Sequence, residues 1–518
     1  MWTNAFEDCR SHFARAWIFA WITTTFKQLF SRGKEERSDI MSDSTSQDGE
    51  KEAQPVLGYE VDWEGPDDPS VPINWPEWKK RGIIAAICAM RFTTPFASSM
   101  MSPALLSIGK DFPGTSDALL SFTVSIYIIG FGLGPLILAP LSEVYGRNVV
   151  YHVSNVFFTI FIACCGLSPN VGALLAFRLA AGFFGGAPLT NGGGTIADLV
   201  PVHKRGLIMS IFSAVMLVGP VLGPVIGGFL AQAMSWRWIF WILTIMSGIA
   251  NILCFIFLRE TYSPVLLERK ARYLRKKTGD PLYHPKGKSS KTLGQLLLVA
   301  ITRPVRMLAN PIILGTSIYT AVIYGIFYLL LTILSIVFHD QYGFKEGIAG
   351  LAYLGIGIGS VLGMVIFGLY SDRIYTKLSE KHKEAKPEYR LPPLLPSALA
   401  MPIGLFIYGW TAHYRLHWIL PIVGTGFCGF SLMGCLTAVQ TYLLDGFTIY
   451  ASSALAASSL VRSLAGGLVS LSGPGLYDRM GLGWGNSLLA FLSILFGLSP
   501  LLFYKYGERL RQCRIGVD

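Results

Sequence analysis

The sequence predicts an all-α membrane protein with twelve transmembrane helices in two pseudo-symmetric six-helix bundles. Three observations lead to this fold class. Charged residues make up 14% of the 518 residues, against about 25% in a typical soluble protein. Long apolar runs recur along the chain, and a transmembrane helix needs about 20 such residues. The widest gap between runs, residues 259–310, divides them six and six.

Each apolar run is long enough to cross a bilayer as a helix. The expected spans are 82–102, 118–140, 149–168, 171–195, 207–231, 237–258, 311–338, 347–370, 394–412, 417–444, 450–475 and 484–504. The eight cysteines fall mostly inside these runs and show no C-x-x-C spacing. They are interpreted as small buried side chains, so neither a disulfide framework nor a metal site is expected.

The remaining segments are polar. Residues 1–75 are expected to be a cytoplasmic tail, mostly disordered, in which the aromatic stretch Ala14 to Phe30 is too short to span and is interpreted as an interfacial helix. Residues 76–258 and 311–504 are the two bundles. Residues 259–310 are expected to be a cytoplasmic loop, part amphipathic helix and part linker, and residues 505–518 a cytoplasmic tail.

Lysine and arginine set the expected orientation, because they concentrate in cytoplasmic loops. If both termini and residues 259–310 are cytoplasmic, that side holds roughly 28 basic residues near the spans, and the opposite loops hold about five. The five are Lys110, Arg237, Lys345, Arg415 and Arg479. The formal charge of +11 therefore reflects topology, and nucleic-acid binding is not expected. We expect a multi-pass protein of the plasma membrane with cytoplasmic termini.

The two halves carry matching polar groups at the ends of corresponding spans. The loop after the second span reads PLSEVYGRN, residues 140–148, and the loop after the eighth reads GLYSDRIY, residues 368–375. The fourth span ends with Asp198, and the tenth ends with Asp445. Twelve spans in two related halves are typical of repeat-built secondary transporters.

The charged residues of these two loops indicate a conformational latch. Glu143, Gly146 and Arg147 lie in the first loop, and Asp372 and Arg373 lie in the second. A carboxylate and a guanidinium at helix ends can pair across the mouth of a transporter and hold it facing outward. The glycine permits a tight turn. The alternative is a solvated charge pair that only anchors the topology.

The fifth span is rich in glycine and proline. The stretch MLVGPVLGPVIGGF, residues 216–229, places six such residues at Gly219, Pro220, Gly223, Pro224, Gly227 and Gly228. Gly219, Gly223 and Gly227 recur every fourth residue, so they share one helix face and form a smooth groove. Neighbouring helices can re-satisfy the carbonyls that the prolines leave free. Ordinary close packing of helices is the alternative to a functional role.

Three arginines lie within expected spans: Arg91 in the first, Arg178 in the fourth and Arg462 in the eleventh. A buried guanidinium is costly in hydrocarbon, so each is a hypothesis of function. Arg91 is expected either to contact an anionic or polar substrate or to make structural hydrogen bonds. Arg462 is expected to pair near the inner mouth with Asp445. For Arg178, the alternative is a side chain that snorkels to the surface.

Aromatic residues of the spans are the remaining candidates for substrate contact. Tyr324, Tyr328 and Tyr442, with Tyr127, could stack on a drug-like substrate. Packing within the bundles is the alternative for each of these side chains.

The patterns together resemble the major facilitator superfamily, and within it the twelve-span drug:proton antiporters of the fungal branch that exports toxins and drugs. Further phrases support the resemblance: NWPEWKK before the first span, WRWIFWI opening the sixth, RETYSPVLLERKARYLRKKTG after it and VIYGIFYLL in the seventh. The resemblance covers about residues 72–510. It departs from the family pattern in the first latch loop, where Glu143 takes the place of an aspartate and Val144 and Asn148 replace basic residues.

The resemblance implies the mechanism and the direction of transport. It implies that Arg178 takes part in proton coupling, that spans one, four, seven and ten line a central site, and that the glycine–proline pattern belongs to an antiporter. No Asp or Glu lies near the middle of a span, so the proton carrier is expected at the mouth, at Asp198 or Glu143, or on the substrate.

We therefore expect a secondary transporter that exports drugs, toxins or secondary metabolites by alternating access, with protons and a small-molecule substrate as partners in the lipid bilayer. It is expected to act as a monomer, with the proton gradient as energy source and no cofactor, because no Walker motif occurs. An enzyme is not expected, since no catalytic triad or metal spacing emerges. The alternatives are an importer of a vitamin, polyamine or other nutrient, and a non-transporting sensor.

Overall fold

A computed structural model describes residues 59–65, 67–286, 293–384, 386–447 and 450–512. The aromatic stretch Ala14 to Phe30 lies outside these residues. Nearly all of the described chain is helical, and the expected all-α membrane fold is confirmed. The apolar composition explains this, because a helix satisfies every backbone donor and acceptor internally in the absence of water.

The first half contains six crossings. Two of them are divided into shorter helices: the first crossing runs through α2 and α3, and the fourth runs through α6 and α7. The elements are α2 (Glu77–Ser99), η2 (Ser102–Ala104), α3 (Leu105–Asp111), α4 (Asp117–Tyr145), α5 (Arg147–Gly166), α6 (Val171–Gly185), α7 (Ala187–Leu199), α8 (Val202–Ala233) and α9 (Arg237–Phe257).

The second half repeats this order of six crossings, after the two helices of the linker, α10 (Ser263–Thr278) and α11 (Leu293–Met307). Its elements are α12 (Pro311–Tyr342), α13 (Glu346–Leu351), α14 (Tyr353–His382), η3 (Pro387–Arg390), α15 (Leu394–His413), α16 (Ile419–Gly446), α17 (Ala451–Val469), η5 (Ser470–Ser472), α18 (Gly473–Gly497) and α19 (Ser499–Gln512).

Eleven helical segments in the described residues are long and apolar enough to cross a membrane. The last, Ala451–Arg511, is 61 residues long and contains two crossings. The helix breaks at Gly481, which has a φ of 69°. Across this break, the hydroxyl of Tyr477 donates to Oδ1 of Asn486 at 2.9 Å. These crossings are the expected eleventh and twelfth spans.

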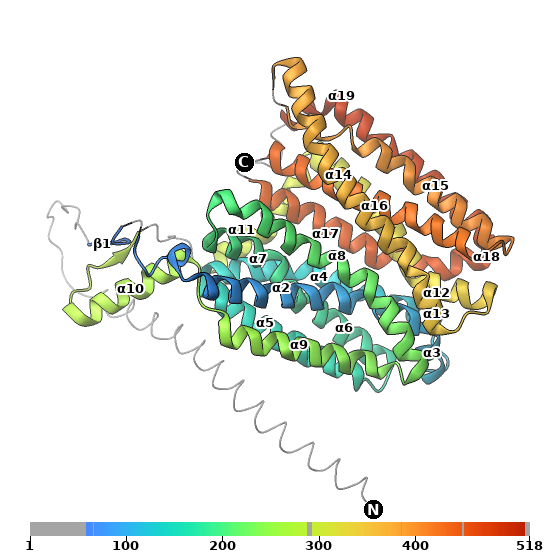
Figure 1. Ribbon diagram of the computed structural model, residues 1–518, viewed down its shortest axis with the longest axis horizontal. Coiled ribbons are helices and arrows are strands. Elements are labelled where there is room, and N and C mark those ends of the chain that lie inside the picture. The colour runs from blue at the N-terminus through green and yellow to red at the C-terminus, as the bar shows by residue number, and fades with distance from the viewer. Residues whose placement is uncertain (1–58, 66, 287–292, 385, 448–449, 513–518) are drawn as a thin grey trace, which may run out of the picture. The chain divides into compact units, whose positions relative to one another are not determined.

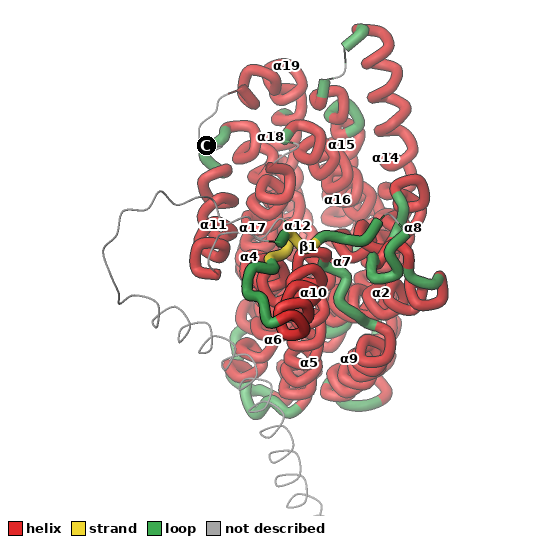
Figure 2. The backbone as a smooth tube through the Cα atoms, turned by 90° about the vertical axis from the view of Figure 1, so that its left-hand side faces the viewer, coloured by secondary structure: helices red, strands yellow, loops and turns green. Residues whose placement is uncertain are grey.

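The spans of each half pack chiefly against one another. In Figure 1 the first half (blue to green) and the second half (orange to red) form two groups of roughly parallel helices. The halves meet where α8 packs on α13 and α14, and where α4 packs on α17. We call the end of the molecule that carries α10 the α10 end and the opposite end the α3 end; Figure 2 looks toward the α10 end.

The linker pairs with the segment that precedes the first span. Strand β1 (Glu60–Val61) runs parallel to β2 (His284–Pro285), with Glu60 opposite His284. Nζ of Lys286 lies 2.6 Å from Oδ2 of Asp62, and Nζ of Lys270 lies 3.0 Å from Oε1 of Glu64. We call residues 59–68 with their contacts on the linker the clip.

The clip corrects the expectation of a disordered tail in its last part. Residues 59–65 and 67–72 of the expected tail are ordered, because acidic side chains there find basic partners on the linker. In the C-terminal segment, residues 505–512 continue helix α19. There, Nε of Arg511 lies 3.1 Å from Oε1 of Glu388 in η3.

Candidate functional site

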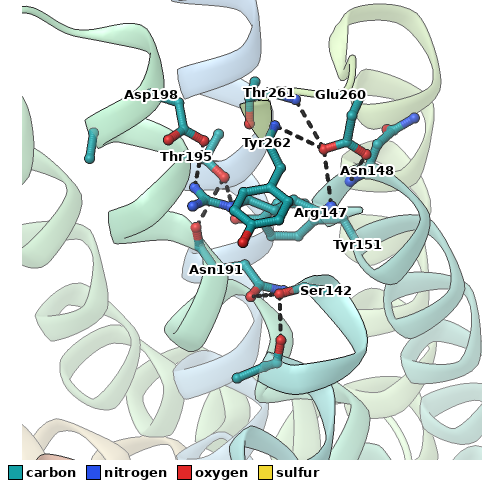
Figure 3. Close-up of polar contacts among 12 residues, drawn as sticks. Ser142, Arg147, Asn148, Tyr151, Asn191, Thr195, Asp198, Glu260, Thr261 and Tyr262 are labelled. Carbon is teal, nitrogen blue, oxygen red and sulfur yellow. Dashed lines mark hydrogen bonds and ion pairs between the residues drawn. The ribbon is translucent and has the colours of Figure 1, made fainter. Parts of the chain in front are cut away.

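An ion pair joins two helices of the first half at the α10 end. Nη1 of Arg147, at the first position of α5, lies 2.8 Å from Oδ2 of Asp198 near the end of α7 (Figure 3). Both side chains are mostly buried, with exposures of 16% and 22%. Cζ of Arg147 also lies 5.3 Å from the ring centroid of Tyr262, and burial raises the pKa of that tyrosine. The pair therefore lies in a shielded setting, where its attraction is stronger than at an open surface.

Glu260, which follows the sixth span, caps the N-terminus of α5 next to this ion pair. Its carboxylate accepts from the backbone N–H of Arg147 at 3.1 Å and of Asn148 at 3.3 Å (Figure 3). It also accepts from its own neighbours, Thr261 at 3.1 Å and Tyr262 at 3.0 Å. Negative charge at a helix N-terminus is favourable. The carboxylate thus ties the linker to α5 next to the ion pair.

Two glycines make room for this arrangement. Gly146 has a φ of 93°, and a Cβ there would lie 2.1 Å from Oε2 of Glu260. Gly194 on α7 lies against Arg147, and a Cβ there would come within 2.5 Å of its guanidinium. The expected tight turn at Gly146 is present, and the glycine also admits the capping carboxylate.

The second half repeats the ion pair at the corresponding place. Nε of Arg390, in η3 before the ninth span, lies 2.9 Å from Oδ2 of Asp445 near the end of the tenth span. The same guanidinium hydrogen-bonds to Asp372 and lies 4.3 Å from the ring centroid of Tyr375. Asp198 and Asp445 occupy corresponding positions in the two halves. Each therefore forms an ion pair with an arginine at the start of the preceding span.

In this conformer the paired carboxylates of the two loops and span ends, Asp198, Asp372 and Asp445, contact arginines of their own half. A latch across the mouth in the outward-facing state stays a prediction. Glu143 is exposed and has no ion pair in the described residues, so Arg147 pairs with Asp198 instead. Arg373 is likewise exposed, and Asp372 is paired with Arg390.

Arg178 is fully buried and bound by backbone carbonyls. Its guanidinium donates to Ala97 at 2.7 Å and Ser98 at 3.3 Å in the last turn of α2, and to Thr123 at 3.0 Å and Val124 at 3.1 Å in α4. It does not snorkel. A cation at a helix C-terminus is favoured by the helix dipole, and α2 has no basic residue of its own in that turn. Arg178 therefore holds three helices of the first half together.

The glycine face of α8 is confirmed as a close-packing surface within the first half. A Cβ at Gly219, Gly223 or Gly227 would lie 2.7, 2.6 or 1.9 Å from atoms of the first span. Only Gly228 faces the other half, where a Cβ would lie 2.5 Å from the carbonyl oxygen of Glu346. Pro220 and Pro224 lie inside the same continuous helix.

Polar contacts join the two halves at the α3 end. The hydroxyl of Ser107 on α3 hydrogen-bonds to Glu346 on α13. The backbone N–H of Gly347 donates to Oε1 of Gln232 at 3.0 Å. With Gly228 packed on Glu346, these contacts join the ends of the first and fifth spans to the start of the eighth.

Arg91 lies in the interior of the first half. Its Cζ is 4.1 Å from the ring centroid of Phe212, and its Nη2 donates to the sulfur of Met216 at 3.4 Å. It also borders a cavity of about 10 Å³ with Pro95, Phe131 and Leu189, among others. In the described part of the chain it has no acidic partner.

Arg462 is placed differently from our expectation. Its Cζ lies 4.9 Å from the ring centroid of Tyr324, and its Nη2 donates to the hydroxyl of Ser459 at 3.2 Å. The expected pairing with Asp445 is wrong, because Asp445 holds Arg390. Tyr324 stacks in turn on Tyr328, at 4.9 Å between ring centroids.

Tyr442 and Tyr127 are packing residues. Tyr442 is fully buried near the end of α16, with its hydroxyl close to Gly507 of α19. The hydroxyl of Tyr127 donates to the carbonyl of Thr94 at 2.9 Å, and its ring lies 4.7 Å from Cζ of Arg178. In this conformer both side chains pack between helices, and substrate stacking at these two positions stays a prediction.

The fold and its repeated ion pairs define a secondary transporter built from two related six-helix bundles. Residues 87–470 match the model of the Major Facilitator Superfamily, and the chain belongs to this family.

Related proteins agree with this assignment. The chain is 47% identical to the MFS-type transporter penM of Penicillium rubens, covering 90% of this chain and 92% of that protein. It is also 47% identical to the efflux pump radE of Floropilus chiversii, covering 87% of this chain and 84% of that one. Among solved structures, the xylose transporter XylE from E. coli in a partially occluded inward open conformation has the same fold, with a TM-score of 0.62 at 18% identity over 83% of this chain and 98% of that one.

The roles of two residues of the site were not predicted from the sequence. Arg390 lies 55 positions before Asp445 and outside any apolar run. The one sequence signal for it is the repeat, because Arg147 occupies the corresponding place before the third span. Glu260 lies just after the sixth span, and its role depends on a contact with Arg147, 113 positions away. Sequence spacing carries no signal for such a contact.

Proposed function

We propose that this protein exports small amphipathic molecules, such as toxins or secondary metabolites, by alternating access coupled to inward proton flow. The repeated ion pair carries the proposal. Each half holds its own α10 end together, through Arg147 with Asp198 and through Arg390 with Asp445. Two internally tied bundles are suited to moving as rigid bodies around a site between them. Relatives named as an efflux pump and as MFS-type transporters support the direction.

The contacts at the α3 end supply a gate that is able to open. They consist of a few hydrogen bonds, from Ser107 to Glu346 and from Gln232 to Gly347. Glycine packing at Gly228 adds close contact without interlocked side chains. Such contacts are lost at small cost when each polar group meets water instead. In the proposed cycle they break as the α10 end closes.

The proposed orientation has the α10 end in the cytoplasm of the cell, with the protein acting as a monomer in the plasma membrane. The basic linker helix α10 supports it, since its last turn carries Arg275, Lys276 and Lys277. Positively charged segments next to spans remain on the cytoplasmic side. The α3 end then faces outward.

Asp198 is the proposed proton-responsive group. Its carboxylate is mostly buried and faces one guanidinium, that of Arg147. Protonation would remove the negative charge and weaken the hold of α7 on α5, because the attraction is electrostatic. Proton binding at the α10 end would in this way loosen one half and favour a change of conformer.

Transport by the purified protein in proteoliposomes tests this proposal. An imposed pH gradient should drive accumulation of an amphipathic fluorescent compound, and a protonophore should abolish it. Cells lacking the protein should retain at least one compound more strongly than normal cells. Unchanged retention over a broad panel, together with reduced uptake of a nutrient, would show an importer instead.

A further inference from the structure

Two arginines of the membrane interior lack an acidic partner in the described part of the chain. Each is stacked on an aromatic ring from a neighbouring helix of its own half. In the first half, Arg91 on α2 lies over Phe212 on α8. In the second half, Arg462 on α17 lies over Tyr324 on α12.

The two stacks occupy matching pairs of spans. The first joins spans one and five, and the second joins spans seven and eleven, which are their counterparts in the repeat. The arginine comes from span one in the first half and from span eleven in the second. Counted along their helices, Arg91 lies about 21 Å and Arg462 about 17 Å from the α10 end. Both guanidiniums therefore lie at a similar depth near the middle of the membrane.

Helix α4 connects the surroundings of the two arginines. Phe131 on α4 lines the small cavity beside Arg91. The next residue, Gly132, faces the other half, and a Cβ there would lie 2.7 Å from the hydroxyl of Ser463. Ser463 is the neighbour of Arg462 in sequence. The two arginines thus border the region between the halves from opposite sides.

The guanidinium groups of Arg91 and Arg462 make few hydrogen bonds in this structure. Arg91 donates only to a thioether sulfur, and Arg462 only to a serine hydroxyl within one turn of its own helix. Nε of each has no hydrogen-bond partner in the described residues. Arg178 is the internal contrast, because its guanidinium donates to four carbonyls. A buried charge without compensation is costly, so a counter-charge from outside the chain is favoured.

Resting on the proposed transport function, we propose that the substrate class is an aromatic organic anion, bound between Arg91 and Arg462 during transport. A carboxylate or similar group accepts charge-assisted hydrogen bonds from the free guanidinium donors. The neighbouring rings of Phe212 and Tyr324 offer apolar surface for the rest of the molecule. The cavity beside Arg91 holds about one water in this conformer, so the ligand enters when the halves separate.

A matched pair of small molecules tests the charge requirement. 1-Naphthoate and 1-naphthamide share a ring system and differ in charge. With the full purified chain in detergent, naphthoate should raise the unfolding temperature more than naphthamide at equal concentration. Equal shifts for both compounds would overturn the proposal, as would a larger shift for naphthamide. Chloride at the concentration of the probe should not reproduce the shift; if it does, the site binds inorganic anions and the organic substrate class is wrong.

Substitution of each arginine locates the site. Arg91→Gln and Arg462→Gln should each weaken the apparent affinity for naphthoate by at least about tenfold, whereas affinity for naphthamide should change little. Arg237→Gln is the control, because Arg237 pairs with Asp111 at the α3 end. Without ligand, the Arg91 and Arg462 variants should unfold at the same or a higher temperature than the parent chain, since an unpaired charge is removed. A lower temperature for both, with unchanged naphthoate affinity, would show that they only hold the fold.

Transport separates this inference from the proposal on which it rests. In proteoliposomes, naphthoate should be moved and its movement should depend on both arginines. Movement of naphthamide but not naphthoate would contradict the anion site and leave the transport function standing. Binding of naphthoate without movement of either compound would contradict the transport function and leave the anion site standing.

Discussion

Arg147 and Asp198 meet at 2.8 Å on the first half of the protein, and Arg390 and Asp445 repeat the contact at 2.9 Å on the second. In both cases the arginine precedes an odd-numbered span and the aspartate ends the following one. The repeated geometry points to the same structural demand in both halves. That demand is to fasten neighbouring helix ends within a moving bundle.

The first prediction concerns this ion pair. Asp198→Asn should lower pH-driven transport at least tenfold and reduce the free energy of unfolding by about 1–3 kcal/mol, because a mostly buried guanidinium loses its counter-charge. Transport in proteoliposomes and thermal unfolding measure the two effects. Glu143→Gln is the control and should leave both nearly unchanged, since Glu143 is exposed and unpaired in the described residues. A large effect at Glu143 with none at Asp198 would reverse our assignment of the pair.

The second prediction concerns the contact between the Arg147 side chain and α7. Gly194→Ala should weaken transport several-fold, because its Cβ would lie within 2.6 Å of the guanidinium and displace it from Asp198. Gly193→Ala is a matched control one residue away, where a Cβ meets only the flexible Met209 side chain at 3.5 Å. Initial rates of transport for the two variants should differ clearly. Equal rates would mean that Arg147 has room to move without loss.

The third prediction concerns Arg178. Arg178→Gln and Arg178→Lys should both lower the unfolding temperature, because neither side chain reproduces a guanidinium bound to carbonyls of two helices. Thermal unfolding of the purified protein measures this. The resemblance to antiporters implies proton coupling for the same residue, and a variant that folds normally but loses pH-driven transport would favour that role over the structural one.

The fourth prediction concerns the glycine face of α8. Gly227→Ala should destabilise the protein, because its Cβ would lie 1.9 Å from the carbonyl oxygen of Met100 and force the first and fifth spans apart. Gly248→Ala on α9 is the control, since a Cβ there meets nothing within 4 Å and alanine favours a helix. The unfolding temperature should fall for Gly227→Ala and rise for Gly248→Ala. A tolerated Gly227→Ala would show that the close packing is dispensable.

The fifth prediction concerns pH and the clip. The hydrogen bond from Lys286 and the backbone N–H of Trp63 hold the pKa of Asp62 below its ordinary value. A carboxyl with a lowered pKa stabilises the folded state above its unfolded pKa, and this contribution is lost as pH falls through the folded value. The clip should therefore be intact at pH 7 and loosen below about pH 4.

Hydrogen exchange at His284 and Lys286, whose N–H groups donate to Tyr59 and Val61, measures the clip directly. After correction for intrinsic rates, protection there should fall at low pH and at high salt. Lys286→Gln should show the low protection already at pH 7. Protection that is unaffected by pH, salt and the substitution would mean that backbone pairing alone holds the clip.

The sequence was sufficient for the fold and for the places where charges gather. Apolar length and basic loops determine where helices cross, and each expected span overlaps a helix of the structure. Several bounds differ, because polar helical turns extend the crossings: α14 continues to His382, beyond the expected end at residue 370. Pairing was harder to predict. Arg462 and Asp445 are close in sequence, yet Arg390 reaches the aspartate because η3 brings it to the end of the tenth span. The clip was not predicted. The composition of residues 59–72 shows that they are polar, but it does not show that Lys270 and Lys286 of the linker pair with their acidic side chains.

Alternating access is the central claim, and paired distances at the two ends of the same helices test it most directly. With native cysteines replaced, spin labels at Met234 and Ile348 report on the α3 end, and labels at Lys204 and Lys377 report on the α10 end; all four side chains are exposed. On changing pH and adding a transported compound, the α3-end distance should lengthen while the α10-end distance shortens. Distances that stay fixed, or that change in the same direction at both ends, would contradict the account.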